Sequence, residues 1–148
     1  MQAIVLIGPQ ASGKSSFCKE RLFNSHLRLN LDMLRTRHRE ALLLAACIAA
    51  KQPVVIDNTN PTAADRARYL GQFKAAGYAV HGYFFPDAFE VCQARNAQRL
   101  GKARIPDVGL KDFFARLERP THQEGFDALF SVSLQNDEFV VEALSDAI

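Results

Sequence analysis

One stretch near the start of the chain has the residue types and the spacing needed to hold phosphate groups. Residues 8–15 read GPQASGKS and match the pattern G-x-x-x-x-G-K-[ST]. In such a loop the glycines let the backbone curl so that its N–H groups point inward, and the following helix adds the positive end of its dipole. Lys14 supplies a cation, and the Ser15 hydroxyl suits the Mg2+ that accompanies a nucleoside triphosphate. The stretch therefore predicts a nucleotide-binding loop.

An ordinary glycine-rich turn is the alternative interpretation of this stretch. An apolar run, residues 3–7, precedes the loop, and helix-compatible residues 16–23 follow it, which is the context that a phosphate loop requires. We expect Lys14 to act in catalysis as well as in binding, by neutralising the phosphates. The residues expected to contact ATP are those of the loop and the first turn of the helix, namely Gly8, Pro9, Gln10, Ala11, Ser12, Gly13, Lys14, Ser15 and Ser16.

Two aspartates follow short apolar runs farther along the chain. Asp32 comes directly after residues 27–31, and Asp57 comes directly after residues 54–56. Ligands of open α/β sheets lie beyond the carboxyl ends of the strands, so both carboxylates are candidates for the same site. Asp57 has the form of a Walker B residue, which holds the metal directly or through water. Asp32 is placed to accept a proton from an acceptor hydroxyl, and the alternative is that it only caps the next helix.

The positive charge of the chain is concentrated in one segment. Residues 95–119 contain seven Lys and Arg against three Asp and Glu. Arg95 and Arg99 are four residues apart, which puts them on one face of a helix. Lys102 and Arg104 lie in the basic connection that follows. Arg104 joins Arg95 and Arg99 in a candidate lid over the nucleotide, in which Arg95 binds ATP and Arg99 stabilises the transferred group. A solvated helix face is the alternative explanation of this charge.

Length and composition predict one ordinary globular domain over residues 1–148. The chain is 48% hydrophobic and carries a net charge of +2, which argues neither for nor against a polyanionic partner. Cys18, Cys47 and Cys92 are far apart and odd in number, so we expect buried, reduced thiols in a cytoplasmic protein rather than a metal site or a disulfide framework. No run has the length that a membrane span requires.

Strand and helix patterns alternate through most of the sequence. We predict strands at 3–7, 27–31, 54–56, 78–85, 128–134 and 138–141, and helices at 14–23, 33–50, 62–76, 88–100 and 107–119. The second half of the 33–50 helix reads ALLLAACIAA, which predicts burial. The alternation indicates an α/β protein of the P-loop NTPase fold, with a mostly parallel sheet and helices on both faces.

Several segments together resemble the kinase domain of polynucleotide 5'-kinase/3'-phosphatases. They are GPQASGKSS, the N-x-D of Asn30 and Asp32, VVIDNTNPTAADRARYLGQFKAAGYAV at residues 54–80, and the segments RIPDVGL and EGFDALF. The resemblance extends over essentially the whole chain, and DNTNP is more specific than the phosphate loop. The family usually has N-R-D where this chain has Leu31 in the middle position, and its D-x-D-G-T phosphatase signature is not present in this sequence.

The resemblance implies a role for each matching residue. Asp32 matches the general base for the 5'-hydroxyl, and Arg35 matches the arginine that contacts the phosphate of the acceptor. Arg99 corresponds most closely to the essential lid arginine, with Arg95 nearby. Asp57 corresponds to the aspartate of the family's DTN segment, and we place it with Arg35 in substrate binding and with Ser15 at the metal.

Three functions are compatible with these residues. The first is an ATP-dependent, Mg2+-requiring kinase of the 5'-hydroxyl of a polynucleotide or oligonucleotide. The second is a kinase of a small hydroxyl compound such as a nucleoside, sugar or antibiotic. Arg35, Arg37 and Arg39 favour an acceptor that carries phosphate, whereas the near-neutral total charge favours a small one. The third, a nucleotide-dependent switch, has no use for Asp32 as a base, and the N-K-x-D motif that reads guanine is not in the sequence.

Overall fold

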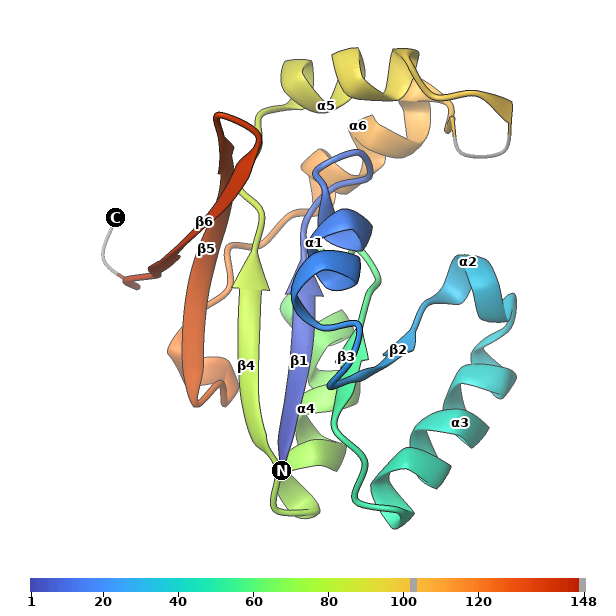
Figure 1. The fold of residues 1–148 in the computed structure, drawn as a ribbon, viewed down its shortest axis with the longest axis vertical. Helices are drawn as coiled ribbons and strands as arrows, with labels where there is room; N and C mark the ends of the chain where they lie inside the picture. Colours follow the sequence, from blue (N-terminus) through green and yellow to red (C-terminus); the bar gives the residue numbers. More distant parts are fainter. Residues whose placement is uncertain (102–103, 147–148) are drawn as a thin grey trace.

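A computed structural model describes residues 1–101 and 104–146 of the chain (Figure 1). The strands are β1 (Gln2–Ile7), β2 (Leu27–Leu29), β3 (Val54–Ile56), β4 (Ala79–Phe84), β5 (Ala128–Gln135) and β6 (Glu138–Ala143). The helices are α1 (Lys14–Arg21), α2 (Leu31–Leu34), α3 (Arg37–Ala49), α4 (Ala63–Ala75), α5 (Phe89–Ala97) and α6 (Asp107–Arg116), with a 3-10 turn η2 (His122–Glu124).

The strands form one six-stranded sheet in the order β2-β3-β1-β4-β5-β6. Neighbouring strands from β2 to β5 are parallel, and β6 runs antiparallel to β5. Asn136 and Asp137 form the turn between β5 and β6, both with positive φ, as a two-residue hairpin of this kind requires. The structure confirms the predicted α/β fold with a mostly parallel sheet.

Alternate residues of the central strand β1 pack into two different cores. Ala3, Val5 and Ile7 belong to a cluster that includes buried residues of α3 and α4. Ile4 and Leu6 belong to a cluster with residues of α1. Side chains alternate between the two faces of a strand, so both faces of the sheet are covered. Figure 1 shows α1 and α4 on opposite sides of the sheet. This double covering explains why β1 and β3 read as continuous apolar runs.

The sheet order changes direction beside β1. From β1 the chain reaches β2 and β3 on one side of that strand, and then β4 and β5 on the other side. Ligands of open α/β sheets bind at such a switch point, outside the carboxyl ends of the strands. The phosphate loop follows β1 at this place, and Asp57 directly follows β3. The topology therefore brings the candidate residues to one edge of the sheet.

The prediction of a single helix over residues 33–50 is wrong in two respects. The chain forms two helices, α2 and α3, because Arg35 has a φ of +77° and Thr36 caps α3 by accepting a hydrogen bond from the Arg39 N–H. The second half of the predicted helix, residues 41–50, is not uniformly buried, since Leu42 and Leu43 are 59% and 42% exposed. Only one face of α3 packs on the sheet, so apolar composition alone overestimated its burial.

Other boundaries differ from the predictions by a few residues. Strand β2 ends at Leu29 rather than Leu31, and α5 ends at Ala97 rather than residue 100. The three cysteines are buried and unpaired, as predicted. Among the described helices, none is both long enough and apolar enough to cross a bilayer.

Candidate functional site

The loop between β1 and α1 adopts the curled shape that its glycines allow. Gly13 has a φ of +95°, a left-handed conformation that favours glycine. A Cβ at Gly8 would lie 2.8 Å from the Phe85 Cβ, so a larger residue does not fit there. The Gly8 N–H donates to the Thr59 carbonyl at 3.0 Å, which ties the loop to the segment after β3. The backbone of the loop is therefore fixed at its Gly8 end.

Lys14 is buried inside this loop. Its Nζ donates to the Gly8 carbonyl at 2.8 Å and to the Pro9 carbonyl at 2.7 Å. The Ser12 hydroxyl donates to the same Pro9 carbonyl at 2.7 Å. Burial lowers the pKa of the Lys14 ammonium from 10.5 to about 8, against an opposing effect of the Asp57 carboxylate. The lysine is thus held in place before any phosphate arrives.

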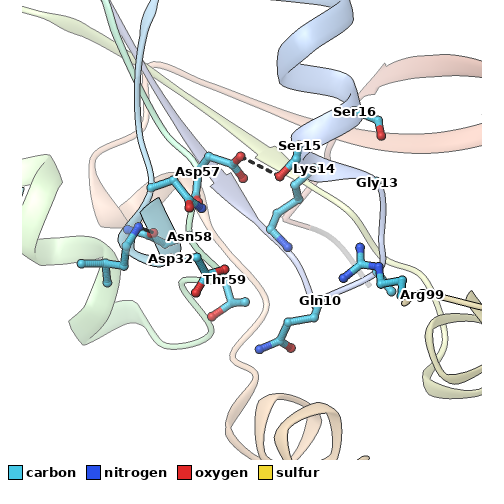
Figure 2. A pocket seen from close by; sticks show the side chains of 13 residues that line it. Gln10, Gly13, Lys14, Ser15, Ser16, Asp32, Asp57, Asn58, Thr59 and Arg99 are labelled. Carbon is cyan, nitrogen blue, oxygen red and sulfur yellow. Dashed lines mark hydrogen bonds between the residues drawn. The ribbon is translucent and has the colours of Figure 1, made fainter. Parts of the chain in front are cut away.

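The loop opens into a pocket of about 240 Å³ that collects most of the predicted site residues (Figure 2). In Figure 2, Asp32, Asn58 and Thr59 lie on one side of Lys14, and Arg99 lies on the other. The lining residues are Gln10, Ala11, Gly13, Lys14, Ser15, Ser16, Asn30, Leu31, Asp32, Asp57, Asn58, Thr59 and Arg99. Of the predicted residues, Gly8, Pro9, Ser12, Arg35 and Arg95 do not line this pocket.

Ser15 and Asp57 meet at one wall of the pocket. The Ser15 hydroxyl donates to Asp57 Oδ2 at 3.0 Å, the hydrogen bond that is dashed in Figure 2. A hydroxyl beside a buried carboxylate is a pair of oxygen ligands of the kind that Mg2+ takes in phosphotransferases, so these residues fit the predicted metal.

A third residue, Arg28, joins this pair and was missed by the sequence analysis. Its Nε donates to Asp57 Oδ2 at 2.7 Å, and its Nη2 donates to the Ser15 hydroxyl at 3.2 Å. The guanidinium therefore uses the same two oxygen atoms that a metal ion would use. The available signal was a lone arginine in an otherwise apolar strand, two residues before Asn30, but nothing in the sequence indicated its partner.

Asp32 lies in the first turn of α2 and does not cap it. The side chain of Asn30 accepts from the Met33 N–H at 3.0 Å and is the N-cap. The alternative that Asp32 serves as the helix cap is therefore wrong. Asp32 is exposed and lines the pocket that Lys14 also lines, which leaves its carboxylate available for chemistry.

The segment that carries Asp32 is positioned by a half-buried polar network. Asn58 Oδ1 accepts from the Leu31 N–H at 2.9 Å. Asn58 Nδ2 donates to Glu40 Oε2 at 3.0 Å and to the Tyr69 hydroxyl at 3.1 Å. Because Glu40 belongs to α3 and Tyr69 to α4, Asn58 connects the start of α2 to two longer helices. Asn58 is a positioning residue that the DNTNP motif contained but that the sequence analysis gave no role.

Arg35 ends α2 with strained backbone geometry. Its φ of +77° is uncommon for a residue with a side chain and costs energy of order 1–3 kcal/mol. The residue is exposed and lies outside the pocket lining. The backbone conformation of Arg35 turns the chain sharply between α2 and α3, and α2 is therefore short.

The arginines of the predicted lid are arranged differently from the prediction. Arg95 lies in the last turn of α5 and is held by the Asp87 carboxylate at 2.7 Å and the Ala11 carbonyl at 3.3 Å. Arg99 lies beyond the end of α5, so the two do not share one helix face, yet Arg99 lines the pocket. Arg104 is exposed and outside the lining, and Lys102 lies outside the described residues.

Sequence comparisons identify relatives of most of the chain. A bifunctional polynucleotide phosphatase/kinase of Schizosaccharomyces pombe is 26% identical over 129 residues, which cover 84% of this chain and 32% of that protein. The chain spans about a third of the length of the curated relatives it matches. These relatives agree with the resemblance seen in the sequence.

Structural comparisons find the same fold in solved proteins. Kti12 of Chaetomium thermophilum, determined in complex with ADP-AlF3, has a TM-score of 0.68 at 18% identity and covers 92% of this chain and 91% of its own. A gluconokinase from Sinorhizobium meliloti 1021 has a TM-score of 0.62 at 20% identity and covers 89% of this chain and 82% of its own. At these identities the likeness shows the fold alone.

The family assignment follows from a match along most of the sequence. Residues 4–120 match the family described as AAA domain. The matched region includes the phosphate loop, Asp32, Asp57 and Arg99. The chain therefore belongs to this AAA domain family, with a nucleotide-binding phosphate loop and the fold of P-loop kinases.

Proposed function

We propose that this chain is an ATP-dependent kinase that transfers the γ-phosphate to the 5'-hydroxyl of a polynucleotide or oligonucleotide. The observation that carries the proposal is the placement of Asp32 in one pocket with Lys14, on a helix end fixed by Asn58. A switch that only bound nucleotide would have no need for a carboxylate positioned to receive the proton of an acceptor.

Five side chains of the pocket have a role in this reaction. The loop N–H groups and Lys14 bind the β- and γ-phosphates, and Arg99 stabilises charge on the transferred group. The acceptor oxygen attacks the γ-phosphorus while the bond to the β–γ bridging oxygen breaks and ADP leaves. The acceptor proton passes to the Asp32 carboxylate. Ser15 and Asp57 would hold Mg2+, which supplies charge neutralisation when bound.

The acceptor is assigned from two kinds of support. The relative from Schizosaccharomyces pombe is a polynucleotide kinase by name, and it matches 84% of this chain. Arg35, at the end of α2 and three residues after Asp32, matches the arginine that contacts the acceptor phosphate in the family that the sequence resembles. A small hydroxyl compound is the second candidate acceptor. The fold shared with a gluconokinase and the net charge of only +2 favour it.

The test is to offer the protein separate acceptors with γ-labelled ATP and Mg2+. The acceptors are 5'-hydroxyl DNA, 5'-hydroxyl RNA, nucleosides and sugars, and Lys14→Ala serves as the inactive control. We expect label at the 5' end of the polynucleotides. Label on small molecules alone would overturn the proposed acceptor, and release of free phosphate with every acceptor unlabelled would overturn the kinase assignment.

A further inference from the structure

A second groove lies beside the catalytic pocket, between α1 and the edge strand β2. It has a volume of about 480 Å³. Its walls come from α1, the turn after α1, β2 and α2, and they include Ser15, Cys18, Lys19, Phe23, Arg28 and Met33. None of the roles derived above uses this groove as a binding site.

Two large apolar side chains of the groove are exposed to solvent. Phe23 is 73% exposed and Met33 is 57% exposed. A single exposed apolar residue needs no explanation, but an aromatic ring and a thioether that line the same groove form a surface for a flat ligand. Aromatic rings of this kind are the stacking platforms of proteins that bind single-stranded nucleic acid.

The charged side chains of the groove favour an anionic ligand. Lys19 is exposed, and the Arg28 side chain is 35% exposed while its pairing with Asp57 fixes its position. Among the described residues that line the groove, none is acidic. Burial and the neighbouring His81 lower the pKa of His26, which also lines the groove. The charged side chains of Lys19 and Arg28 therefore lie next to the apolar surface of Phe23 and Met33. This matches a nucleotide, in which the phosphate lies close to the base.

The groove adjoins the catalytic pocket. Ser15 lines both, and Met33 directly follows Asp32 in α2. An acceptor whose terminal hydroxyl is at Asp32 therefore has its adjoining part close to Met33.

We propose that this groove binds the second nucleotide of a single-stranded polynucleotide acceptor, with its base stacked on Phe23 beside Met33 and its phosphate near Lys19. This inference rests on the proposed function and extends it, because it gives the kinase a preference for acceptors longer than one nucleotide. Stacking accepts any base, so the groove selects for length and for single strands rather than for sequence.

The experiment measures the affinity of the protein for acceptors of increasing length. Competition against a fluorescently labelled 5'-hydroxyl oligothymidylate gives the affinities of a nucleoside 3'-phosphate, a dinucleotide and a tetranucleotide, without ATP. In the wild type we expect a clear gain from one nucleotide to two. Phe23→Ala should remove this gain and weaken the binding of the longer acceptors by roughly 5- to 150-fold, the range of a lost base stack.

Matched variants separate stacking from other effects. Phe23→Trp keeps an aromatic face and should retain the gain, whereas Phe23→Leu keeps apolar area without that face and should lose most of it. Lys19→Ala should weaken the longer acceptors and lower the salt dependence of their binding. Leu42→Ala removes an exposed apolar side chain of α3, away from the groove, and should change nothing. Unchanged affinity for an ATP analogue checks that each variant is folded.

The failure of this inference is distinct from the failure of the proposed function. If polynucleotides are phosphorylated but Phe23→Ala binds every acceptor as the wild type does, the groove does not bind the acceptor and only this inference falls. The same holds if Phe23→Leu behaves as Phe23→Trp does, because stacking is then not involved. If no polynucleotide is labelled or bound, the proposed function falls as well.

Discussion

The two sides of the candidate site are constructed in different ways. On the donor side, a loop buried between β1 and α1 holds Lys14 by its own carbonyls, and the loop is tied to Thr59. On the acceptor side, Asp32 lies on α2, a helix of four residues that is capped by Asn30 and held at its start by Asn58. No residue of α2 is buried.

This difference corresponds to the different ligands that we propose for the two sides. Nucleotide phosphates have the same shape whatever the acceptor, so backbone groups fixed by the fold are sufficient to bind them. Acceptors vary, and a short exposed helix can change its side chains without disturbing a core. We therefore expect substitutions to separate nucleotide binding from acceptor phosphorylation.

The largest effect on nucleotide binding is expected from Lys14→Ala. The variant loses a charged donor next to the phosphates, and a hydrogen bond to a charged group contributes about 1.5–3 kcal/mol. Nucleotide affinity should therefore fall by roughly 10- to 150-fold in an equilibrium binding assay. Lys111→Ala, an exposed lysine of α6, is the control and should bind normally. Wild-type affinity in Lys14→Ala would show that the loop is not the phosphate site.

Asn58→Ala should weaken acceptor phosphorylation while leaving nucleotide binding intact. The Leu31 N–H loses its acceptor and Asp32 loses its fixed position, so acceptor kcat/KM should fall by roughly 10- to 100-fold. Nucleotide affinity should stay close to that of the wild type. The free energy of unfolding should fall by about 1–3 kcal/mol, since Glu40 also loses a partner. Gln72→Ala, on the exposed face of α4, is the control, and equal losses of nucleotide and acceptor binding would contradict the network.

The pH dependence of nucleotide binding tests the burial of Lys14. Its pKa of about 8 in the ligand-free protein means that the ammonium is charged below pH 8 and neutral above it. Phosphates favour the charged form, so affinity should be constant below about pH 7 and fall by up to about tenfold per pH unit above the pKa. Lys14→Arg stays charged across this range and should show a flat profile. A flat profile in the wild type would contradict the assignment.

Arg28→Ala should have the smallest effect of these substitutions. It should make Mg2+-dependent nucleotide binding easier, whereas the others weaken binding or activity. The Arg28 guanidinium donates to Asp57 Oδ2 and the Ser15 hydroxyl, the two oxygen atoms that would hold Mg2+ in the proposed reaction, so the two cations would compete for them. A partly exposed ion pair contributes up to about 1 kcal/mol, so its removal should lower the Mg2+ concentration for half-maximal nucleotide binding by up to about fivefold. Arg116→Ala removes an exposed ion pair of α6 and serves as the control. An unchanged or higher Mg2+ requirement would contradict this competition.

The residues of the donor side could be predicted from the sequence because each belongs to a pattern of consecutive residues. The spacing from Gly8 to Ser15 fixes a loop within eight consecutive residues, and Asp57 directly follows an apolar strand. Parallel strands bring their carboxyl ends together, so local patterns were sufficient to predict that Ser15 and Asp57 meet. Their hydrogen bond confirms this arrangement.

The acceptor side depends on contacts between residues that are distant in the sequence. There Asn58 meets Leu31 across 27 positions, and the same holds for the missed contact of the donor side, where Arg28 meets Asp57 across 29. No local pattern encodes such pairs. The break at Arg35 was missed for a related reason, since strong helix formers on both sides favour one continuous helix, and only the tertiary anchors of α2 and α3 hold its strained backbone.

The most direct test of this account is the turnover of Asp32→Asn with a 5'-hydroxyl oligonucleotide, measured together with its nucleotide affinity. Asparagine keeps the shape of the side chain but cannot take the acceptor proton. We expect kcat to fall by roughly 100-fold or more, the effect of a lost general base, while nucleotide affinity stays that of the wild type. Asp112→Asn, an exposed aspartate of α6, should be fully active. Wild-type kcat in Asp32→Asn would contradict the central claim that Asp32 is the base of the acceptor side.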